Sequence, residues 1–204
     1  FNYGDYTNKE HYIGLGFKKE SYNNNFELIS STDTEYQDIP VFNSADRRFG
    51  FSWIPADRQT EMLDGVETTT QYEYNEENGL PRKTTVHGNH NKDFVTYNTY
   101  AYESSSSAGM ATDHMLTQGQ LVVVGDENTE FGPQLSDIQG AMAVTETRYD
   151  DNFGNGAWRL DDVRNWGDID GDGIIDTGEM KTASNIISYD NYGNVLRAQD
   201  ALGN

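Results

Sequence analysis

Three stretches of this chain repeat one local pattern. In each, a short strand ending in tyrosine is followed by a turn of acidic or amide residues, a glycine and a second strand. Asp, Asn and Gly tolerate positive φ angles, so such a turn can reverse the chain between antiparallel strands. The stretches cover residues 69–85, 144–158 and 185–204. The pattern predicts a fold built from β-hairpins.

The rest of the chain has the same character, with apolar residues at spacing two or in short runs between Gly, Asn and Asp clusters. Strands are predicted at residues 12–17, 66–74, 95–102, 120–124, 144–149 and 186–189. A single short helix is predicted at residues 55–63, because Pro55 suits a first helical position and Gly65 can end the helix. Residues 104–109 read as a flexible loop and residues 125–132 as a polar turn. We therefore expect an all-β fold of antiparallel hairpins with little helix.

The hairpin turns resemble the tyrosine-aspartate (YD) repeat of the Rhs family, whose motif is roughly Tyr-Asp-x-x-Gly-Asn/Arg before a second strand. The last stretch matches in register through Tyr189, Asp190, Gly193 and Asn194. The middle one matches with one extra turn residue through Tyr149, Asp150, Gly154 and Asn155. Tyr74, Asn75 and Gly79 match loosely.

This resemblance implies a β-sheet spiral that closes into a hollow shell, in large secreted or surface proteins of bacteria that often enclose a toxic domain. Residues 1–143 are then a β-rich region with one loose YD-like hairpin at about 69–85, and residues 144–204 are YD hairpins with an inserted loop. We expect the chain to be a fragment of a much larger polypeptide. The family's self-cleavage segment is absent from the sequence, so no residue is assigned to autoproteolysis.

Residues 168–179 satisfy the twelve-residue calcium-loop pattern D-x-[DN]-x-[DN]-G-x₅-E at every constrained position. Ca²⁺ is a hard cation that takes six to eight oxygen ligands, and this spacing wraps side chains and one carbonyl around it. Gly173 allows the sharp reversal, and the apolar Ile175 can fasten the loop to a core. The predicted ligands are Asp168, Asp170, Asp172, the backbone of Ile174, Asp176 through water and a bidentate Glu179.

The flanks of the loop do not supply the amphipathic helices of a paired EF-hand. We therefore expect a lone loop that holds a structural ion, since a regulatory switch needs helices that reorient. The alternative is a solvated acidic turn that binds nothing.

Charge and cysteine content limit the partners. Thirty-four acidic residues against 14 basic ones give a formal charge of -20, which repels phosphate backbones and anionic lipids. Nucleic acid partners and membrane insertion are therefore not expected, and the longest aliphatic run, residues 121–124, is far too short for a membrane span. The absence of cysteine excludes disulfides and thiolate sites, and bound calcium is a common substitute for disulfides in extracellular proteins.

Other signals have simpler explanations. His87 and His90 have an H-x-x-H spacing but no third zinc ligand, which favours a solvated pair. Trp53, Trp158 and Trp166 could form a sugar-binding face, although packing is the more common role. Asp161 and Asp162 lie just upstream of the loop and could lend it extra ligands or point at water, and water is the expectation.

The leading functional hypothesis is a non-enzymatic shell or stalk segment of a secreted or cell-surface protein, stabilised by calcium. Its partners would be the remainder of its own polypeptide and possible contacts with a secretion apparatus or target-cell surface. Two alternatives stay open: an adhesin or glycan-binding module, and a polysaccharide-degrading module, for which no catalytic constellation stands out.

Overall fold

The structure is a computed structural model that describes residues 15–40, 52–88, 92–151, 157–176 and 178–203. Its strands pair antiparallel throughout, which confirms the predicted all-β class with little helix. The chain forms two compact units, Phe1–Tyr72 and Glu73–Asn204. The boundary expected at residues 143/144 depends on the repeat pattern, which these contacts do not test. No helix in the described ranges is long and apolar enough to cross a membrane.

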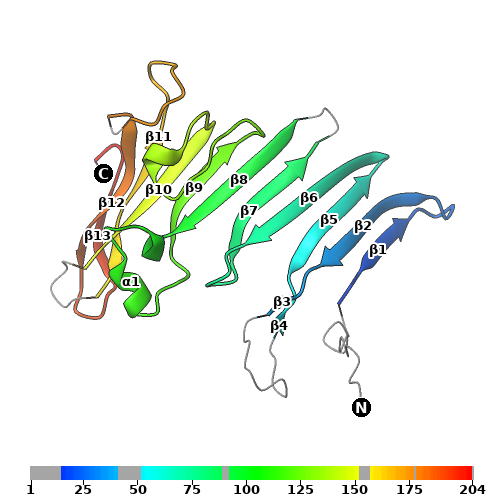
Figure 1. The fold of residues 1–204 in the computed structure, drawn as a ribbon, viewed down its shortest axis with the longest axis horizontal. Helices are drawn as coiled ribbons and strands as arrows, with labels where there is room; N and C mark the ends of the chain where they lie inside the picture. Colours follow the sequence, from blue (N-terminus) through cyan, green and yellow to red (C-terminus); the bar gives the residue numbers. More distant parts are fainter. Residues whose placement is uncertain (1–14, 41–51, 89–91, 152–156, 177, 204) are drawn as a thin grey trace, which may run out of the picture. The chain divides into compact units, whose positions relative to one another are not determined.

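The first unit is a meander of antiparallel strands in the order β1-β2-β5-β6 (Figure 1). Their bounds are Lys18–Tyr22 (β1), Leu28–Tyr36 (β2), Ala56–Leu63 (β5) and Val66–Tyr74 (β6). A short pair, β3 (Ile39–Pro40) and β4 (Ser52–Trp53), lies in the connection between β2 and β5. The side chains of β1, β2, β5 and β6 are half-buried or exposed.

The helix predicted at residues 55–63 is wrong, because β5 occupies Ala56–Leu63. Asp64 and Gly65 both have positive φ angles, 50° and 79°, as a two-residue hairpin turn requires. This turn sets Leu63 opposite Val66, and β2 pairs with the other edge of β5. Hydrogen bonds to neighbours on both edges therefore replace the bonds that a helix would make within itself.

The second unit is a meander in which each strand pairs with its neighbour in the chain, in the order β7-β8-β9-β10-β11-β12-β13 (Figure 1). The bounds are Pro81–His87 (β7), Asp93–Tyr100 (β8), Gly119–Gly125 (β9), Ala143–Asp150 (β10), Arg159–Trp166 (β11), Met180–Tyr189 (β12) and Val195–Asp200 (β13). Three of the six connections between these strands are short, at residues 88–92, 151–158 and 190–194, and the other three, at residues 101–118, 126–142 and 167–179, are longer.

Most of the predicted strands are confirmed, with shifted ends. The prediction at residues 66–74 coincides with β6, while those at 120–124 and 144–149 lie inside β9 and β10. The strand predicted at 186–189 is only the end of β12, and the one at 95–102 stops at Tyr100, where the 3-10 helix Ala101–Glu103 (η2) begins. Of the strand predicted at 12–17, residues 12–14 lie outside the described ranges, and residues 15–17 are not in a strand.

The turns of the YD-like stretches have the chemistry that the repeat pattern predicts. In the β12–β13 turn the Asp190 carboxylate accepts hydrogen bonds from the backbone N–H of Tyr192 and of Asn194, both at 2.8 Å. Gly193 has a φ of 91°, which a residue with a side chain rarely adopts. Asn75 is buried and caps its own turn in the same way, accepting from the N–H of Glu77 at 2.8 Å. The turn at residues 152–156 lies outside the described ranges.

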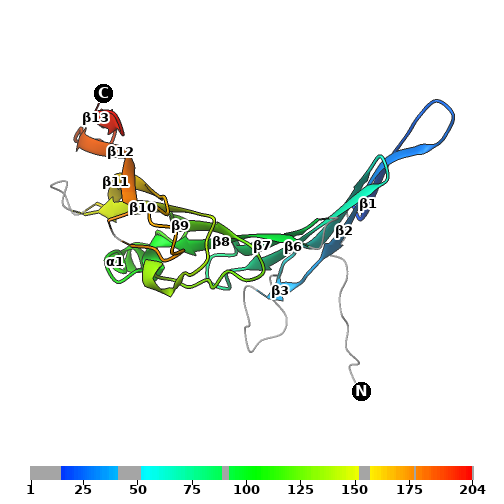
Figure 2. The same cartoon turned by 90° about the horizontal axis from the view of Figure 1, so that it is seen from above.

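Long connections cover part of the second unit and supply its core. Residues 101–118 join β8 to β9 and contain η2 and α1 (Gly109–Thr112), which lies on one side of the strands in Figure 2. Residues 126–142 join β9 to β10 and contain the 3-10 helix Leu135–Asp137 (η3). Ser104 and Ser107 in the first connection are buried, so the loop predicted at residues 104–109 is packed against the protein.

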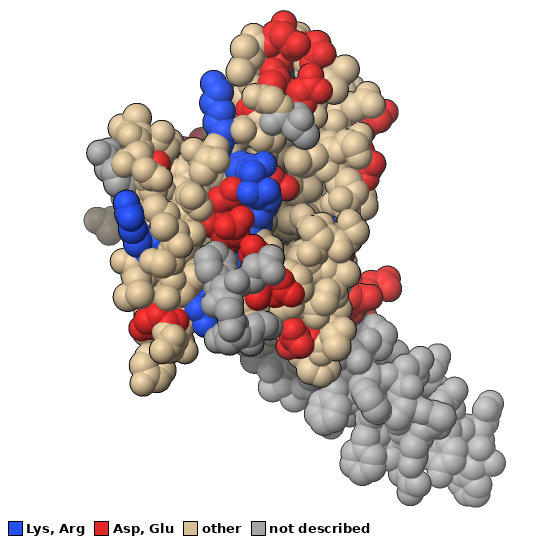
Figure 3. All heavy atoms as spheres, turned by 90° about the vertical axis from the view of Figure 1, so that its left-hand side faces the viewer, with Lys and Arg blue, Asp and Glu red and all other residues tan. Residues whose placement is uncertain are grey.

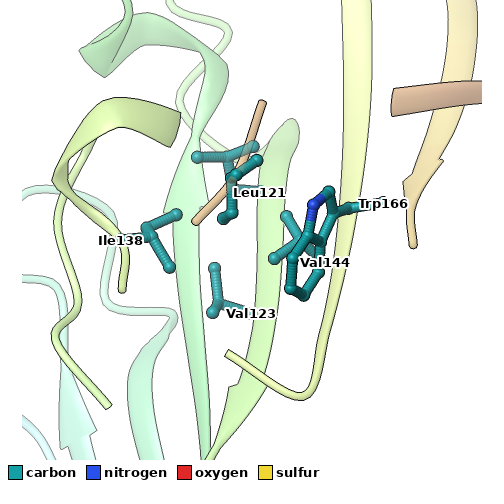
Figure 4. Close-up of a cluster of buried hydrophobic side chains, with 6 residues drawn as sticks. Leu121, Val123, Ile138, Val144 and Trp166 are labelled. Atoms are coloured by element: carbon teal, nitrogen blue, oxygen red, sulfur yellow. The ribbon is translucent and has the colours of Figure 1, made fainter. Parts of the chain in front are cut away.

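Apart from Val95, the buried hydrophobic side chains of the described residues form two clusters, which we call cluster 1 and cluster 2. Cluster 1 consists of Leu121, Val123, Ile138, Val144, Trp166 and Ile175, and Figure 4 shows its labelled members pointing toward one another. Cluster 2 consists of Tyr100, Ala101, Tyr102 and Met110, with Tyr149 and Trp158 packed against it. Full burial of one large aliphatic side chain stabilises the fold by about 1.5–3 kcal/mol, so these clusters account for much of the unit's stability.

Candidate metal-binding loop

The loop at residues 167–179 connects β11 to β12 at one end of their hairpin. Trp166 pairs with Met180 at the last rung of the two strands, and the N–H of Gly167 bonds the carbonyl of Glu179 at 3.4 Å. Antiparallel strands therefore flank the loop on both sides, where an EF-hand would have helices. In Figure 3 acidic side chains gather at the top of the molecule, where Figure 1 places this connection.

Asp168, Asp170 and Asp172 converge within this loop. One carboxylate oxygen from each lies within 4.8 Å of the others, and all these side chains are exposed. The N–H of Asp172 lowers the pKa of Asp170, but burial and the charges of Asp172, Glu179 and Asp168 outweigh it, so the pKa of Asp170 is raised. The three carboxylates thus repel one another, and a bound cation would remove that repulsion.

Backbone hydrogen bonds hold the carboxylates in this arrangement. Asp168 accepts from the N–H of Gly171 at 2.7 Å and of Gly173 at 3.2 Å, and Asp172 accepts from the N–H of Ile174 at 2.8 Å. Gly171 and Gly173 have φ angles of 82° and 71°, so the reversals depend on glycine. The predicted role of Gly173 in the turn is therefore confirmed.

Glu179, the predicted bidentate ligand, is buried and bound to the base of the loop. Its Oε2 accepts a hydrogen bond from Trp166 Nε1 at 2.8 Å, and its Oε1 accepts one from the N–H of Ile169 at 2.7 Å. The N–H of Ile169, followed by the indole N–H of Trp166, lowers the pKa of Glu179. Glu179 is not in the converging group of aspartates. Hydrogen bonds from the backbone of Asp170 and of Asp176 lower its pKa further, and its role as a ligand stays a prediction.

The contact between Trp166 and Glu179 could not be found from the loop pattern, which places constraints only on residues 168–179. The contact follows from strand pairing. Trp166 pairs with Met180, and Glu179 is the residue immediately before Met180. That position is known only once the register of β11 and β12 is known.

The middle of the loop is attached to the core. Ile175 is buried at 9% exposure in cluster 1, as expected, whereas the neighbouring Ile174 is 52% exposed. Ile174 forms an antiparallel bridge with Gln139 of the β9–β10 connection, and the N–H of Gly140 bonds the carbonyl of Gly173 at 3.2 Å. Contacts with the rest of the unit therefore hold the loop at its base and at its middle, and its acidic tip is exposed to solvent.

The remaining predicted ligand, Asp176, is exposed and lies outside the converging group. Its carbonyl accepts a hydrogen bond from the N–H of Glu179 at 3.0 Å. The donor set of the loop is made of carboxylate and carbonyl oxygens, which fits a hard cation such as Ca²⁺ and does not fit a soft one.

Asp162, expected to point at water, is instead buried in an ion-pair network, so that expectation is wrong. It accepts from Arg148 Nε at 2.7 Å and from Arg164 Nε at 3.2 Å, across β10 and β11. Burial alone would raise the pKa of Asp162, but the hydrogen bonds and charges of Arg148 and Arg164 outweigh it and the pKa is lowered. Asp161 is half-buried. Arg164 lies two residues from Asp162 on the same strand, but sequence spacing does not reveal Arg148, which meets Asp162 only through the pairing of β10 with β11.

The other candidate residues have structural partners. Nδ1 of His87 lies 2.9 Å from Oδ1 of Asp93, its cross-strand neighbour, and His90 lies outside the described ranges. Trp166 is buried in cluster 1 and Trp158 packs against cluster 2, as the packing interpretation predicts. Trp53 lies in β4 opposite Ile39.

Comparison with known proteins adds no relative. The scan against protein-family models found no match, and the search of curated proteins found none either. The resemblance to the YD repeat thus rests on the residues and turns of this chain.

Proposed function

We propose that this chain is a non-enzymatic β-sheet segment of a larger extracellular or bacterial surface protein, in which Ca²⁺ holds the β11–β12 loop. The observation that carries the proposal is the convergence of Asp168, Asp170 and Asp172 within a loop whose pattern is that of a calcium loop. The ion would bind these carboxylates, with the carbonyl of Ile174 and the side chains of Asp176 and Glu179 as further ligands.

A structural role is favoured over a switch by what surrounds the loop. Paired strands lie on both sides of it, and Ile175 is packed in cluster 1. A calcium switch needs an element with two alternative packings, such as a pair of helices that reorients. Here the ion would neutralise the aspartates and thereby stabilise the end of the β11–β12 hairpin.

Membership of an Rhs-like shell or stalk is supported by the turn chemistry. Asp190 and Asn75 each cap the turn that follows a strand ending in tyrosine. The partner would then be the remainder of the same polypeptide, with secretion machinery or a target-cell surface as its later contacts. A formal charge of -20 favours solubility in a salty medium, where it is screened.

Calcium titration of the chain tests the proposal. An affinity typical of extracellular modules and about 10 mM Ca²⁺ would stabilise the fold by about 1.4–2.7 kcal/mol. We expect EGTA to lower the Tm by about 3–10 °C and to open residues 167–182 to proteolysis. Asp170→Asn should abolish most of this response, whereas Asp33→Asn, an exposed carboxylate in β2, should keep it. A melting curve that EGTA leaves unchanged would refute the structural ion.

A further inference from the structure

The strands β1, β2, β5 and β6 carry no buried side chain, although they form one continuous sheet. Among the described residues of the first unit only Pro55, in the connection before β5, is buried. Cluster 1 and cluster 2 both lie in the second unit. A sheet is normally stabilised by burying the side chains of at least one face against another layer. A second layer on one face would supply the burial that this sheet lacks.

Strand register assigns the side chains of this sheet to two faces. Directly paired residues share a face, and successive residues alternate between faces. Lys19 pairs with Thr32, which pairs in turn with Glu61, so these residues form a row across β1, β2 and β5. The neighbouring rows on the same face pass through Ser30 and Thr34 of β2, and their residues in β5 and β6 carry no charge. We call the face formed by these three rows the neutral face.

The charge of the neutral face differs from that of the rest of the chain. Lys19 and Glu61 cancel each other on it. The opposite face of the same strands has more acidic than basic residues, with Glu20, Asp33, Glu35 and Glu67 against Lys18 and Arg58. A formal charge of -20 makes two copies of the chain repel each other over most of their surface. Two copies that meet through their neutral faces avoid much of this repulsion.

The neutral face also carries side chains suited to packing against a second sheet. Leu63 and Val66 lie directly opposite each other on it and are 59% and 51% exposed. Thr32 and Thr68 in the central row are half-buried and short. Small side chains in the middle of a face let a second sheet approach to the usual spacing of about 10 Å.

We propose that the neutral face binds the neutral face of a second copy of this chain, so that two sheets pack face to face. Lys19 and Glu61 lie on either side of Thr32. A two-fold axis that runs between the sheets and parallel to β2 therefore sets Lys19 of each copy opposite Glu61 of the other. Within the described residues neither side chain makes an ion pair, and the Glu61 carboxylate accepts one hydrogen bond, from Gln59 Nε2 at 2.8 Å. The contact does not involve the calcium loop.

The size of the face predicts a weak dimer. Four strands at a spacing of about 4.8 Å, with about eight residues rising about 3.3 Å each, give a face of roughly 500 Å². A standard interface buries about 800 Å² on each partner, so this contact belongs to the small, transient class. We therefore expect a dissociation constant on the order of 100 μM.

The test is sedimentation equilibrium of the full chain at about 0.15 M salt, over protein concentrations from about 5 μM to about 1 mM, which bracket that affinity. Lys19→Glu should weaken the dimer by about tenfold or more, because two like-charge contacts replace two ion pairs. Glu61→Lys should have the same effect for the same reason. The double variant Lys19→Glu, Glu61→Lys exchanges the charges and should recover the affinity of the wild type.

Lys18→Glu is the matched control, since it makes the same change of charge one position earlier, on the opposite face, and should dimerise as the wild type does. A second pair of variants does not depend on ion pairing. Thr32→Glu adds a carboxylate at the centre of the neutral face and should abolish the dimer, whereas Ser31→Glu adds it to the opposite face and should not. Thermal unfolding checks that each variant is folded.

Three results would overturn the proposal. The first is a wild-type chain that stays monomeric up to about 1 mM, well above the expected dissociation constant, because the face would then be covered by the chain itself or by nothing. The second is equal weakening by Lys18→Glu and Lys19→Glu, which would reflect net charge alone. The third is a double variant that dimerises no better than the single variants.

Discussion

Ile175 is the residue whose replacement most directly tests how the loop is attached to the core. Its side chain is 9% exposed in cluster 1, next to Trp166 and Val144. An Ile175→Ala substitution removes buried carbons and leaves a cavity, which typically costs about 2–5 kcal/mol. Because this residue lies in a loop that can partly relax into the space, we expect a loss of about 2–3 kcal/mol in the free energy of unfolding.

Ile174→Ala is the matched control, since it makes the same chemical change one position earlier on a side chain that is 52% exposed. Its effect should stay within about 0.5 kcal/mol. Urea unfolding followed by tryptophan fluorescence measures both variants, and amide exchange in β11 and β12 assigns the transition to the second unit. Equal losses for the two variants would refute the attachment of the loop through Ile175.

Three other substitutions test the site and the fold. Glu179→Gln should weaken calcium binding by about tenfold or more, because an amide replaces the predicted bidentate carboxylate, and calorimetry would show whether the affinity moves. The lowered pKa of Asp162 means that its ion pairs stabilise the fold above the unfolded value of 3.8 and that this contribution is lost as the pH falls through the folded pKa. Asp162→Asn should therefore cost about 1–3 kcal/mol at pH 7, and in urea unfolding its difference from wild type should shrink below pH 4. A constant difference would contradict the assignment. Gly193→Ala should lower the stability of the β12–β13 hairpin by about 1–2 kcal/mol, because its φ is 91°, whereas Gly119→Ala has open space and no positive φ and should be neutral in thermal unfolding.

Features that depend on a few consecutive residues could be predicted from the sequence. The strand at residues 66–74, the turn capped by Asp190 and the converging aspartates of the 168–179 loop each follow from local spacing and local hydrogen bonds. Turn residues and alternation act within a few positions, so their signal survives without knowledge of the rest of the chain.

At residues 55–63 such local signals predict the wrong element. Pro55 and Gly65 are compatible with a helix of that length, but Asp64 and Gly65 also make a two-residue hairpin turn. The pairing of β5 with both β2 and β6 decides between the two, and β2 lies more than twenty residues earlier in the chain.

The calcium-loop aspartates and the contacts that attach the loop to the sheet differ in the same way: the first depend on local spacing, and the second depend on strand pairing. Local spacing alone places the carboxylates of residues 168, 170 and 172 on one turn. The bond from Trp166 to Glu179 and the ion pair between Arg148 and Asp162 arise only from the register of adjacent strands. These contacts join residues that are distant in sequence, and their geometry exists only after the sheet has formed.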